Sequence, residues 1–388
     1  MRILYISDFP VLNTGYATVS RHLLRRLIVD YEVCYLPIAG PEHGAFSPEI
    51  FGAEVLPTLS SVNDISYWFF KKDCDVALIL KDPYVFNGIE SLPVFHVFYA
   101  PVAEEPLSPQ YKAITQTAMY IWIPSNWGIR VAKESGIHYQ RLRFVPHGVP
   151  SVYRILDEPE EYRKKFGFPD VDVMISMVSV NRGRKFVPNQ LAGVKKFIEN
   201  NPDLKVGIYL HMSMQPDNYT LHGGWDMGSV LDIYGLSGIT RFPDPYLYKV
   251  GFSEQQMCEL YNATDVLLNA STEGFGLPII EAQACGTPVV TVKHGNGPEI
   301  NFFGLNAEVG AFYHTIMGTM FAIPDPDSVA EQIERAIKIK DTNKRNVSDF
   351  VRKNYDWDVV YRAYIRKELD KIESEIDPRK VVEVIRCG

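Results

Sequence analysis

Short runs of β-branched and aromatic residues alternate along this chain with longer amphipathic segments, and this alternation restricts the fold more than any other feature of the sequence. It begins with a buried-type strand at Ile3–Ser7, a loop over residues 8–14 and a helix from Tyr16 to Ile28. Further strands are predicted at Glu32–Pro37, Val76–Leu80, Val94–Tyr99, Tyr120–Ile123 and Arg143–Val145, with helices near residues 109–117 and 128–135. Because strands that alternate with helices form a mostly parallel sheet covered on both faces, the predicted fold class is α/β.

The alternation of strands and helices stops after Pro146–Pro150. A polar stretch follows, and then the alternation starts again. The second series has predicted strands at Val173–Val178, Val206–Leu210, Ile239–Phe242, Val266–Asn269 and Pro288–Val292, and helices at Gln190–Asn200, Glu254–Ala263 and Pro278–Ala284. A chain of 388 residues suits two domains. We therefore predict two Rossmann-like domains, residues 1–165 and 166–356, that face a central cleft and bind ligands at the carboxyl ends of their strands. Trp357–Ile376 is predicted to be a long amphipathic helix.

Composition excludes several classes of protein. The net charge of −8 argues against a general nucleic-acid-binding protein, which needs a basic surface. The five cysteines, Cys34, Cys74, Cys258, Cys285 and Cys387, are scattered, which indicates reduced thiols in a cytoplasmic protein rather than a disulfide framework. No stretch approaches the roughly 18 apolar residues of a membrane span, so we expect a soluble protein, with peripheral association at a membrane left open.

No metal site is predicted. Four D-x-D triplets occur, at residues 73–75, 170–172, 325–327 and 356–358, and all four lie at predicted turns or helix starts, where aspartate commonly caps. His211 and His222 flank a polar loop without a cysteine or carboxylate at ligand spacing, so a structural role is expected for both.

The segment Asn269–Val290 has the strongest functional pattern. A strand ends near Asn269, a loop with Gly274 and Gly276 follows, and Pro278 falls in the first turn of a helix. Backbone N–H groups at such a helix start bind phosphate or negatively polarised oxygens. Glu273 in the loop and Glu281 on the helix are carboxylates, which accept hydrogen bonds from vicinal hydroxyls. The segment predicts a site for a phosphorylated sugar or nucleotide.

Residues 273–290 resemble the signature of glycosyltransferase family 4, E-G-F-G-x-P-x-x-E-A-x-A-x-G-x-P-V-V, and match it at every fixed position. Met1–Ile28, Val145–Val149, Val250–Asp265 and Tyr355–Trp357 resemble other elements of that family. The resemblance implies the GT-B fold, in which a C-terminal helix, here about residues 357–388, crosses back to the first domain. It implies a retaining enzyme of the hexosyltransferase type (EC 2.4) with an acceptor-side first domain and a donor-binding second domain.

The resemblance also implies site residues. Glu273 is expected to bind the hydroxyls of the transferred sugar, and Glu281 the ribose of the donor nucleotide. The backbone of the loop is expected to contact the sugar and diphosphate through Gly274, Phe275, Gly276 and Leu277. A basic turn follows the first strand of the second domain, and its lysine, Lys185, matches the family lysine that contacts the diphosphate.

The arginine that accompanies this lysine is either Arg182 or Arg184. Gly15, in the loop after the first strand, is expected to let substrates approach the backbone closely, although a tight turn alone also explains it. The nucleotide base is expected near Tyr248–Gly251, a range that includes Val250.

The chain departs from the family pattern at one position. Many members have a histidine near the sugar where this chain has Tyr99, and His96 lies three residues earlier, inside the predicted strand. We expect His96 to be a core or pocket residue. Glu104 is a candidate for contact with the acceptor or for acid–base assistance, and the alternative is a solvated loop carboxylate.

The sequence thus predicts a metal-independent retaining glycosyltransferase that uses a nucleoside diphosphate sugar, such as a UDP- or GDP-sugar, and no other cofactor. The acceptor, whether glycan, lipid or protein, and the oligomeric state are not specified. The missing histidine favours one alternative, a non-catalytic nucleotide-sugar-binding or regulatory protein of the same fold. The paired glutamates disfavour an epimerase or phosphorylase on this fold. A nicotinamide oxidoreductase is disfavoured because no G-x-G-x-x-G follows the first strand.

Overall fold

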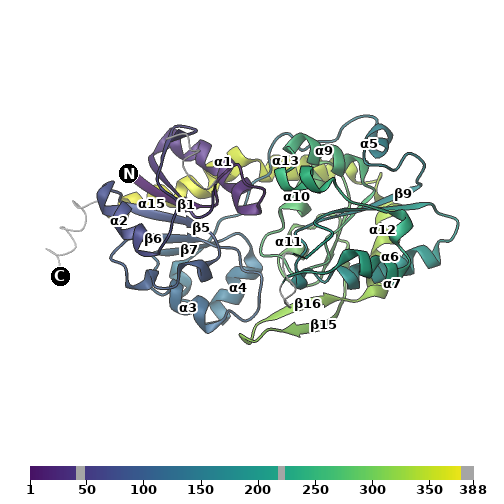
Figure 1. Ribbon diagram of the computed structural model, residues 1–388. Coiled ribbons are helices and arrows are strands. Elements are labelled where there is room, and N and C mark those ends of the chain that lie inside the picture. The colour runs from purple at the N-terminus through teal and green to yellow at the C-terminus, as the bar shows by residue number, and fades with distance from the viewer. Residues whose placement is uncertain (41–48, 217–222, 377–388) are drawn as a thin grey trace. The chain divides into compact units, whose positions relative to one another are not determined.

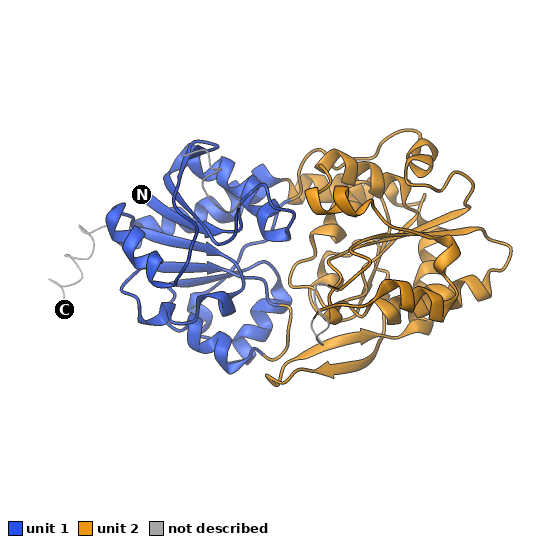
Figure 2. Ribbon diagram, viewed as in Figure 1, with its two compact units in different colours: residues 1–102, 107–148, 357–388 blue, residues 103–106, 149–356 orange. Residues whose placement is uncertain are grey.

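The computed structural model describes residues 1–40, 49–216 and 223–376, and its chain divides into two compact units. Unit 1 comprises residues 1–102, 107–148 and 357–388, and unit 2 comprises residues 103–106 and 149–356 (Figure 2). The division falls at residues 148 and 149, before the boundary expected at residue 165. The polar stretch expected to link the domains is part of unit 2 and contains helix α5 (Pro159–Lys165), which starts at a proline.

Unit 1 is built on an eight-stranded sheet with the strand order β3-β4-β2-β1-β5-β6-β7-β8. At its centre, β1 (Arg2–Ser7) pairs in parallel with β2 (Glu32–Pro37) and β5 (Val76–Leu80). The other strands are β3 (Glu49–Ile50), β4 (Ala53–Val55), β6 (His96–Tyr99), β7 (Tyr120–Ile123) and β8 (Leu142–Phe144). Only the β3–β4 pair is antiparallel among the described strands of this sheet, which confirms the predicted parallel α/β architecture.

Three helices of unit 1 begin at side chains that the sequence supplies as caps. Thr14, Ser108 and Ser125 each accept a hydrogen bond from a backbone N–H in the first turn of the helix that follows. The helices are α1 (Gly15–Asp30), α2 (Asn63–Lys71), α3 (Pro109–Thr115) and α4 (Asn126–Glu134). Strand β6 begins at His96 rather than at Val94 as predicted, and His96 is a buried strand residue whose Nδ1 lies 3.1 Å from the Val94 carbonyl oxygen. It is a core residue, as expected.

The C-terminal helical segment packs in unit 1, as the fold class predicted. It consists of α14 (Trp357–Val360), a π-helical turn (Tyr361–Arg366) and α15 (Lys367–Ile376). The Trp357 ring stacks on His22 of α1 with ring centroids 5.7 Å apart, and Tyr120 of β7 donates a hydrogen bond of 2.8 Å to Glu375. The described part of the chain contains no helix with the length and apolarity that crossing a bilayer requires.

Unit 2 is built on a six-stranded parallel sheet with the order β11-β10-β9-β12-β13-β14. The strands are β9 (Val173–Val178), β10 (Val206–His211), β11 (Thr240–Arg241), β12 (Val266–Leu268), β13 (Val289–Val292) and β14 (Asn306–Ala307). Its helices besides α5 are α6 (Val187–Asn200), α7 (Met227–Tyr234), α8 (Pro245–Val250), α9 (Glu254–Ala263), α10 (Leu277–Ala284), α11 (Gly297–Ile300), α12 (Pro326–Ile339) and α13 (Lys344–Tyr355).

A separate antiparallel ribbon of unit 2, which the sequence did not predict, consists of β15 (Val309–His314) and β16 (Met320–Pro324) (Figure 1). Residues 103–106 join it from the polypeptide between β6 and α3. Glu105 pairs in antiparallel fashion with Met320, and the Met320 N–H donates to the Glu105 carbonyl oxygen at 2.8 Å. Glu105 therefore extends the ribbon by one paired residue at the edge formed by β16.

Candidate functional site

The loop between β12 and α10 contains the predicted motif. Gly276, the residue that precedes α10, has φ +96°, and a Cβ there would lie 2.6 Å from Ile279 Cδ1. A side chain is excluded on both counts, which explains the glycine. Pro278 occupies the first turn, where its missing N–H costs nothing. The loop thus presents the N-terminus of an eight-residue helix at the carboxyl end of β12.

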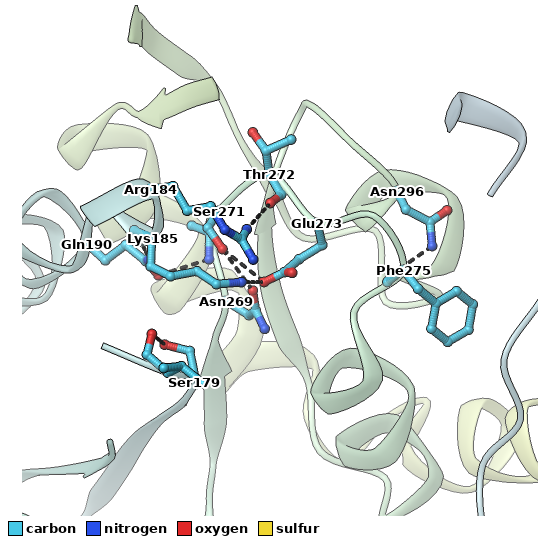
Figure 3. A network of polar contacts seen from close by, with 12 residues as sticks. Ser179, Arg184, Lys185, Gln190, Asn269, Ser271, Thr272, Glu273, Phe275 and Asn296 are labelled. Atoms are coloured by element: carbon cyan, nitrogen blue, oxygen red, sulfur yellow. Dashed lines mark hydrogen bonds and ion pairs between the residues drawn. The ribbon is translucent and has the colours of Figure 1, made fainter. Parts of the chain in front are cut away.

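Lys185 and Glu273, 88 residues apart in sequence, form a buried ion pair beside this loop (Figure 3). Lys185 Nζ donates to Glu273 Oε1, and Ser271 Oγ donates to the same oxygen at 3.0 Å. Lys185 ends the 3-10 turn η4 (Gly183–Lys185), which follows β9. The Gln190 side chain connects this turn to the loop, because it donates to the Lys185 carbonyl at 2.7 Å and accepts from Ala270 N–H at 2.9 Å. The predicted lysine and sugar-binding glutamate therefore meet.

The surroundings of the pair set its charge state. Burial lowers the pKa of Lys185 to about 8, helped by the neighbouring Arg184 cation and opposed by the Glu273 carboxylate. Burial by itself would raise the pKa of Glu273, but the cations of Lys185 and Arg184 and the hydrogen bonds from Lys185 and Ser271 bring it below its ordinary value. Both groups are consequently charged at neutral pH.

The structure distinguishes the two candidate arginines by position. Arg184 Nη1 lies 3.4 Å from the Thr272 carbonyl oxygen, so its guanidinium adjoins the Glu273 loop (Figure 3). Arg182 precedes the same turn and is half-buried. Two fixed cations, Arg184 and Lys185, thus lie against the loop at the start of α10, where an anion is favoured.

Glu281 lies on α10, whereas Glu273 lies in the loop before it, and Glu281 is buried. The Tyr261 hydroxyl of α9 donates to Glu281 Oε2 at 2.8 Å. Burial raises the pKa of Glu281 to about 7, against the Tyr261 hydrogen bond and with a smaller contribution from the Glu254 charge. Sequence reasoning missed Tyr261 as a partner, although it lies in the E-L-Y-N-A segment of the family pattern.

A turn after β13 supports the loop from another side, and sequence reasoning missed this as well. The Asn296 N–H donates to the Glu273 carbonyl at 2.9 Å, and its side-chain Nδ2 donates to the Phe275 carbonyl at 2.8 Å (Figure 3). Gly295 has φ +76°, and a Cβ there would lie 3.0 Å from both backbone N and O of Glu273. The loop can approach this turn so closely because residue 295 has no side chain.

Other predicted site residues lie elsewhere in their units. Gly15 is the first residue of α1 in unit 1, directly after the Thr14 cap. Glu104 is buried in the segment that joins unit 2, so it is not the solvated loop carboxylate considered as the alternative. Val250 ends α8, and 60% of its surface is exposed.

His211 packs in the interior, and Asp325 of one D-x-D triplet caps a helix. The His211 ring packs against Tyr248 and Phe252 with centroids 5.5 and 4.7 Å away, and burial lowers its pKa to about 4. Asp325 caps α12 by accepting from the Ser328 N–H at 2.8 Å. His222 lies outside the described residues. In residues 1–40, 49–216 and 223–376 no cluster of three or more His, Cys, Asp or Glu side chains has the arrangement of a metal site.

Residues 248–350 match the family model described as "Glycosyl transferases group 1". Among curated proteins, D-inositol 3-phosphate glycosyltransferase of Thermobifida fusca is 24% identical over 139 residues, which are 36% of this chain and 31% of that protein. The corresponding protein of Streptomyces coelicolor is 28% identical over 166 residues, or 42% of this chain and 35% of the relative. The alignments thus span about a third of the length of these relatives.

Solved structures resemble nearly the whole chain. Sucrose-phosphate synthase from Thermosynechococcus elongatus superposes with a TM-score of 0.74 and 15% identity, covering 97% of this chain and all of that one. Anabaena HepE in complex with UDP-glucose has a TM-score of 0.71 and 17% identity, with 96% and 100% covered. The family match at residues 248–350 includes the motif at residues 273–290, and the shared architecture shows that the chain has the GT-B fold.

Proposed function

We propose that this protein is a retaining glycosyltransferase that moves a hexose from a nucleoside diphosphate sugar to an acceptor hydroxyl without a metal ion. The observation that supports this most is the buried Lys185–Glu273 pair beside the N-terminus of α10, with Glu281 on the same helix. This combination provides cations for a diphosphate, from the turn after β9, beside a carboxylate for sugar hydroxyls in the loop before α10.

The diphosphate would lie against Lys185, Arg184 and the backbone N–H groups at the start of α10. A departing nucleoside diphosphate develops negative charge, and these preorganised positive groups stabilise it where a metal ion would otherwise be needed. Glu281, buried beside Tyr261, would accept hydrogen bonds from the ribose hydroxyls. In this assignment unit 2 is the donor-binding domain and unit 1 the acceptor-side domain.

Glu273 would bind the transferred sugar. In the structure its carboxylate is held by Lys185 and Ser271, so it is charged and oriented before substrate binds. When the acceptor attacks from the face that the diphosphate leaves, positive charge develops at the anomeric carbon, and a fixed carboxylate stabilises that charge. UDP-glucose is the first donor to test, because the solved HepE structure holds it.

One observation favours the alternative of a non-catalytic nucleotide-sugar-binding protein. Tyr99 occupies the place of the family histidine, and its buried hydroxyl donates to the Pro146 carbonyl at 2.8 Å and lies 2.8 Å from His147 Nδ1. That hydroxyl is committed to the interior of unit 1. If the protein turns over no donor, the alternative holds.

The cysteines bear on where the protein is located, and the proposed reaction bears on the class of its acceptor. The four cysteines of the described residues are buried free thiols, which supports a reducing cytoplasmic location. We infer an acceptor hydroxyl on a glycan, lipid or protein, with association at a membrane surface in the lipid case.

The test combines binding and turnover. UDP-, GDP- and ADP-sugars are screened by thermal shift, and the best donor is assayed for hydrolysis and for transfer. Lys185→Ala should reduce the shift by the nucleoside diphosphate, whereas Lys195→Ala, at a half-exposed position of α6, should preserve it. Equal nucleotide binding by Lys185→Ala and wild type would refute the diphosphate assignment.

A further inference from the structure

The Glu105 side chain contacts an imidazole of unit 2. Residues 103–106 run beside β16, and this pairing brings Glu105 Oε2 to 3.3 Å from His294 Nε2. His294 precedes Gly295 in the turn after β13, and Phe312 of β15 packs edge-on against its ring with centroids 5.3 Å apart. The imidazole therefore lies between a carboxylate and an aromatic ring, mostly shielded from water.

The other ring nitrogen contacts the Glu273 loop. His294 Nδ1 lies 3.1 Å from the Thr272 hydroxyl oxygen, and Thr272 is fully buried. The Ala322 N–H of β16 donates to the same hydroxyl at 3.0 Å. Because the hydroxyl accepts from Ala322, it can donate its own hydrogen to Nδ1. The opposite ring nitrogen, Nε2, faces the Glu105 carboxylate at 3.3 Å.

The contacts of His294 reach the residue next to Glu273. Thr272 directly precedes Glu273, and its carbonyl faces the Arg184 guanidinium. The hydroxyl is held from one side by His294 and from the other by β16, while the carbonyl faces the cationic turn. Residue 272 therefore has little freedom to rotate, and it directly precedes the residue whose carboxylate Lys185 and Ser271 hold.

We propose that His294, oriented by Glu105, is a positioning residue for Glu273, and that the Glu105–His294–Thr272 contacts help Lys185 and Ser271 to keep the Glu273 carboxylate in its reactive orientation. This inference rests on the proposed function, because it assigns a role toward the transferred sugar. It gives the segment between β6 and α3 a role as well: its pairing with β16 supplies the carboxylate that orients the imidazole. Side chains that hold a reactive group in place commonly contribute to rate without contacting substrate.

The test uses five variants. His294→Ala and Glu105→Ala each break the contacts described above, and their double variant tests coupling. Glu105→Gln keeps an acceptor oxygen beside His294. Lys293→Ala, next to His294 in sequence and half-exposed in a pair with Glu308, is the matched control. For each variant, donor hydrolysis or transfer, calorimetric affinity for the nucleoside diphosphate and thermal midpoint are measured. Hydrogen exchange of a peptide covering residues 271–278 is measured in the absence of substrate.

We expect His294→Ala and Glu105→Ala each to lower turnover about 10- to 100-fold, because small displacements of reacting groups cost this much. Nucleoside diphosphate affinity should change less than about threefold. The double variant should be no worse than His294→Ala, since both act through the same contacts. Glu105→Gln and the control should stay within about threefold of wild type, and exchange in residues 271–278 should increase only in the variants that lose the hydrogen bonds.

Three results would overturn the proposal: unchanged turnover in His294→Ala, additive losses in the double variant, or a Glu105→Gln variant as impaired as Glu105→Ala. A parallel loss of nucleotide affinity and thermal midpoint would indicate a merely structural role and would also overturn it. If wild type turns over no donor, the proposed function fails, and unchanged exchange over residues 271–278 in His294→Ala would separately refute the positioning role.

Discussion

Replacing Glu281 by glutamine should stabilise the protein at alkaline pH while weakening nucleotide binding. The carboxyl is buried, and its pKa is raised from an ordinary 4.5 to about 7. In the folded state it binds a proton up to about pH 7, whereas in the unfolded chain it ionises near pH 4.5. Folding therefore takes up a proton between these values, and stability is lost as the pH rises through this window. Above pH 7 the full cost of burying the charge is present.

The size of that cost follows from the shift. A change from 4.5 to about 7, at about 1.4 kcal/mol for each pKa unit, corresponds to roughly 3 kcal/mol. Glutamine has no such proton but can still accept the Tyr261 hydrogen bond through its amide oxygen. Between pH 5 and pH 8, the free energy of unfolding of wild type should fall by roughly 2–3 kcal/mol more than that of Glu281→Gln. This is roughly 4–12 °C in the unfolding midpoint of a unit of this size.

The assay is thermal unfolding of wild type and Glu281→Gln at intervals from pH 5 to pH 8.5, with calorimetric binding of the nucleoside diphosphate at pH 8. Glu331→Gln, exposed on α12 of the same unit, is the control for a change of charge alone. The affinity of Glu281→Gln should fall by a further independent amount, about 1.5–3 kcal/mol, because a charge-assisted hydrogen bond to ribose is lost. If the midpoints of wild type and Glu281→Gln show the same pH dependence, the carboxyl is not the buried acid that this reasoning requires.

Three further predictions concern the same loop. Glu273→Gln should reduce turnover on the order of 100-fold, equivalent to ~2.7 kcal/mol, with nucleoside diphosphate affinity nearly unchanged; equal losses in both would mean that the roles of the two glutamates are reversed. The Lys185 pKa of about 8 predicts that this affinity falls about tenfold between pH 7 and pH 9 as the ammonium loses its proton, a trend that Lys185→Ala should lack in titrations at each pH. EDTA should leave donor binding and turnover intact, and a loss that magnesium restores would contradict the assignment of the phosphate to Lys185.

Local patterns in the sequence predicted much of the fold. The predicted bounds of β2, β5, β7 and β9 agree with the structure. These strands are almost wholly buried runs of apolar residues, a signal that depends only on neighbouring positions. The ribbon of β15 and β16 was not predicted, although Met320–Pro324 is an apolar run, and its two strands are largely exposed or half-buried.

What the sequence by itself determined is the residue chemistry of the site: the glycine loop, the helix start and the two glutamates lie within one segment, and their spacing follows from a strand, a turn and a helix. Only the tertiary structure decided which side chains meet them. Lys185 reaches Glu273, Tyr261 reaches Glu281, and Glu105 joins unit 2 from the polypeptide between β6 and α3. These contacts join residues far apart along the chain, and burial in the folded state gives Lys185 and Glu281 the shifted pKa values that no local pattern encodes.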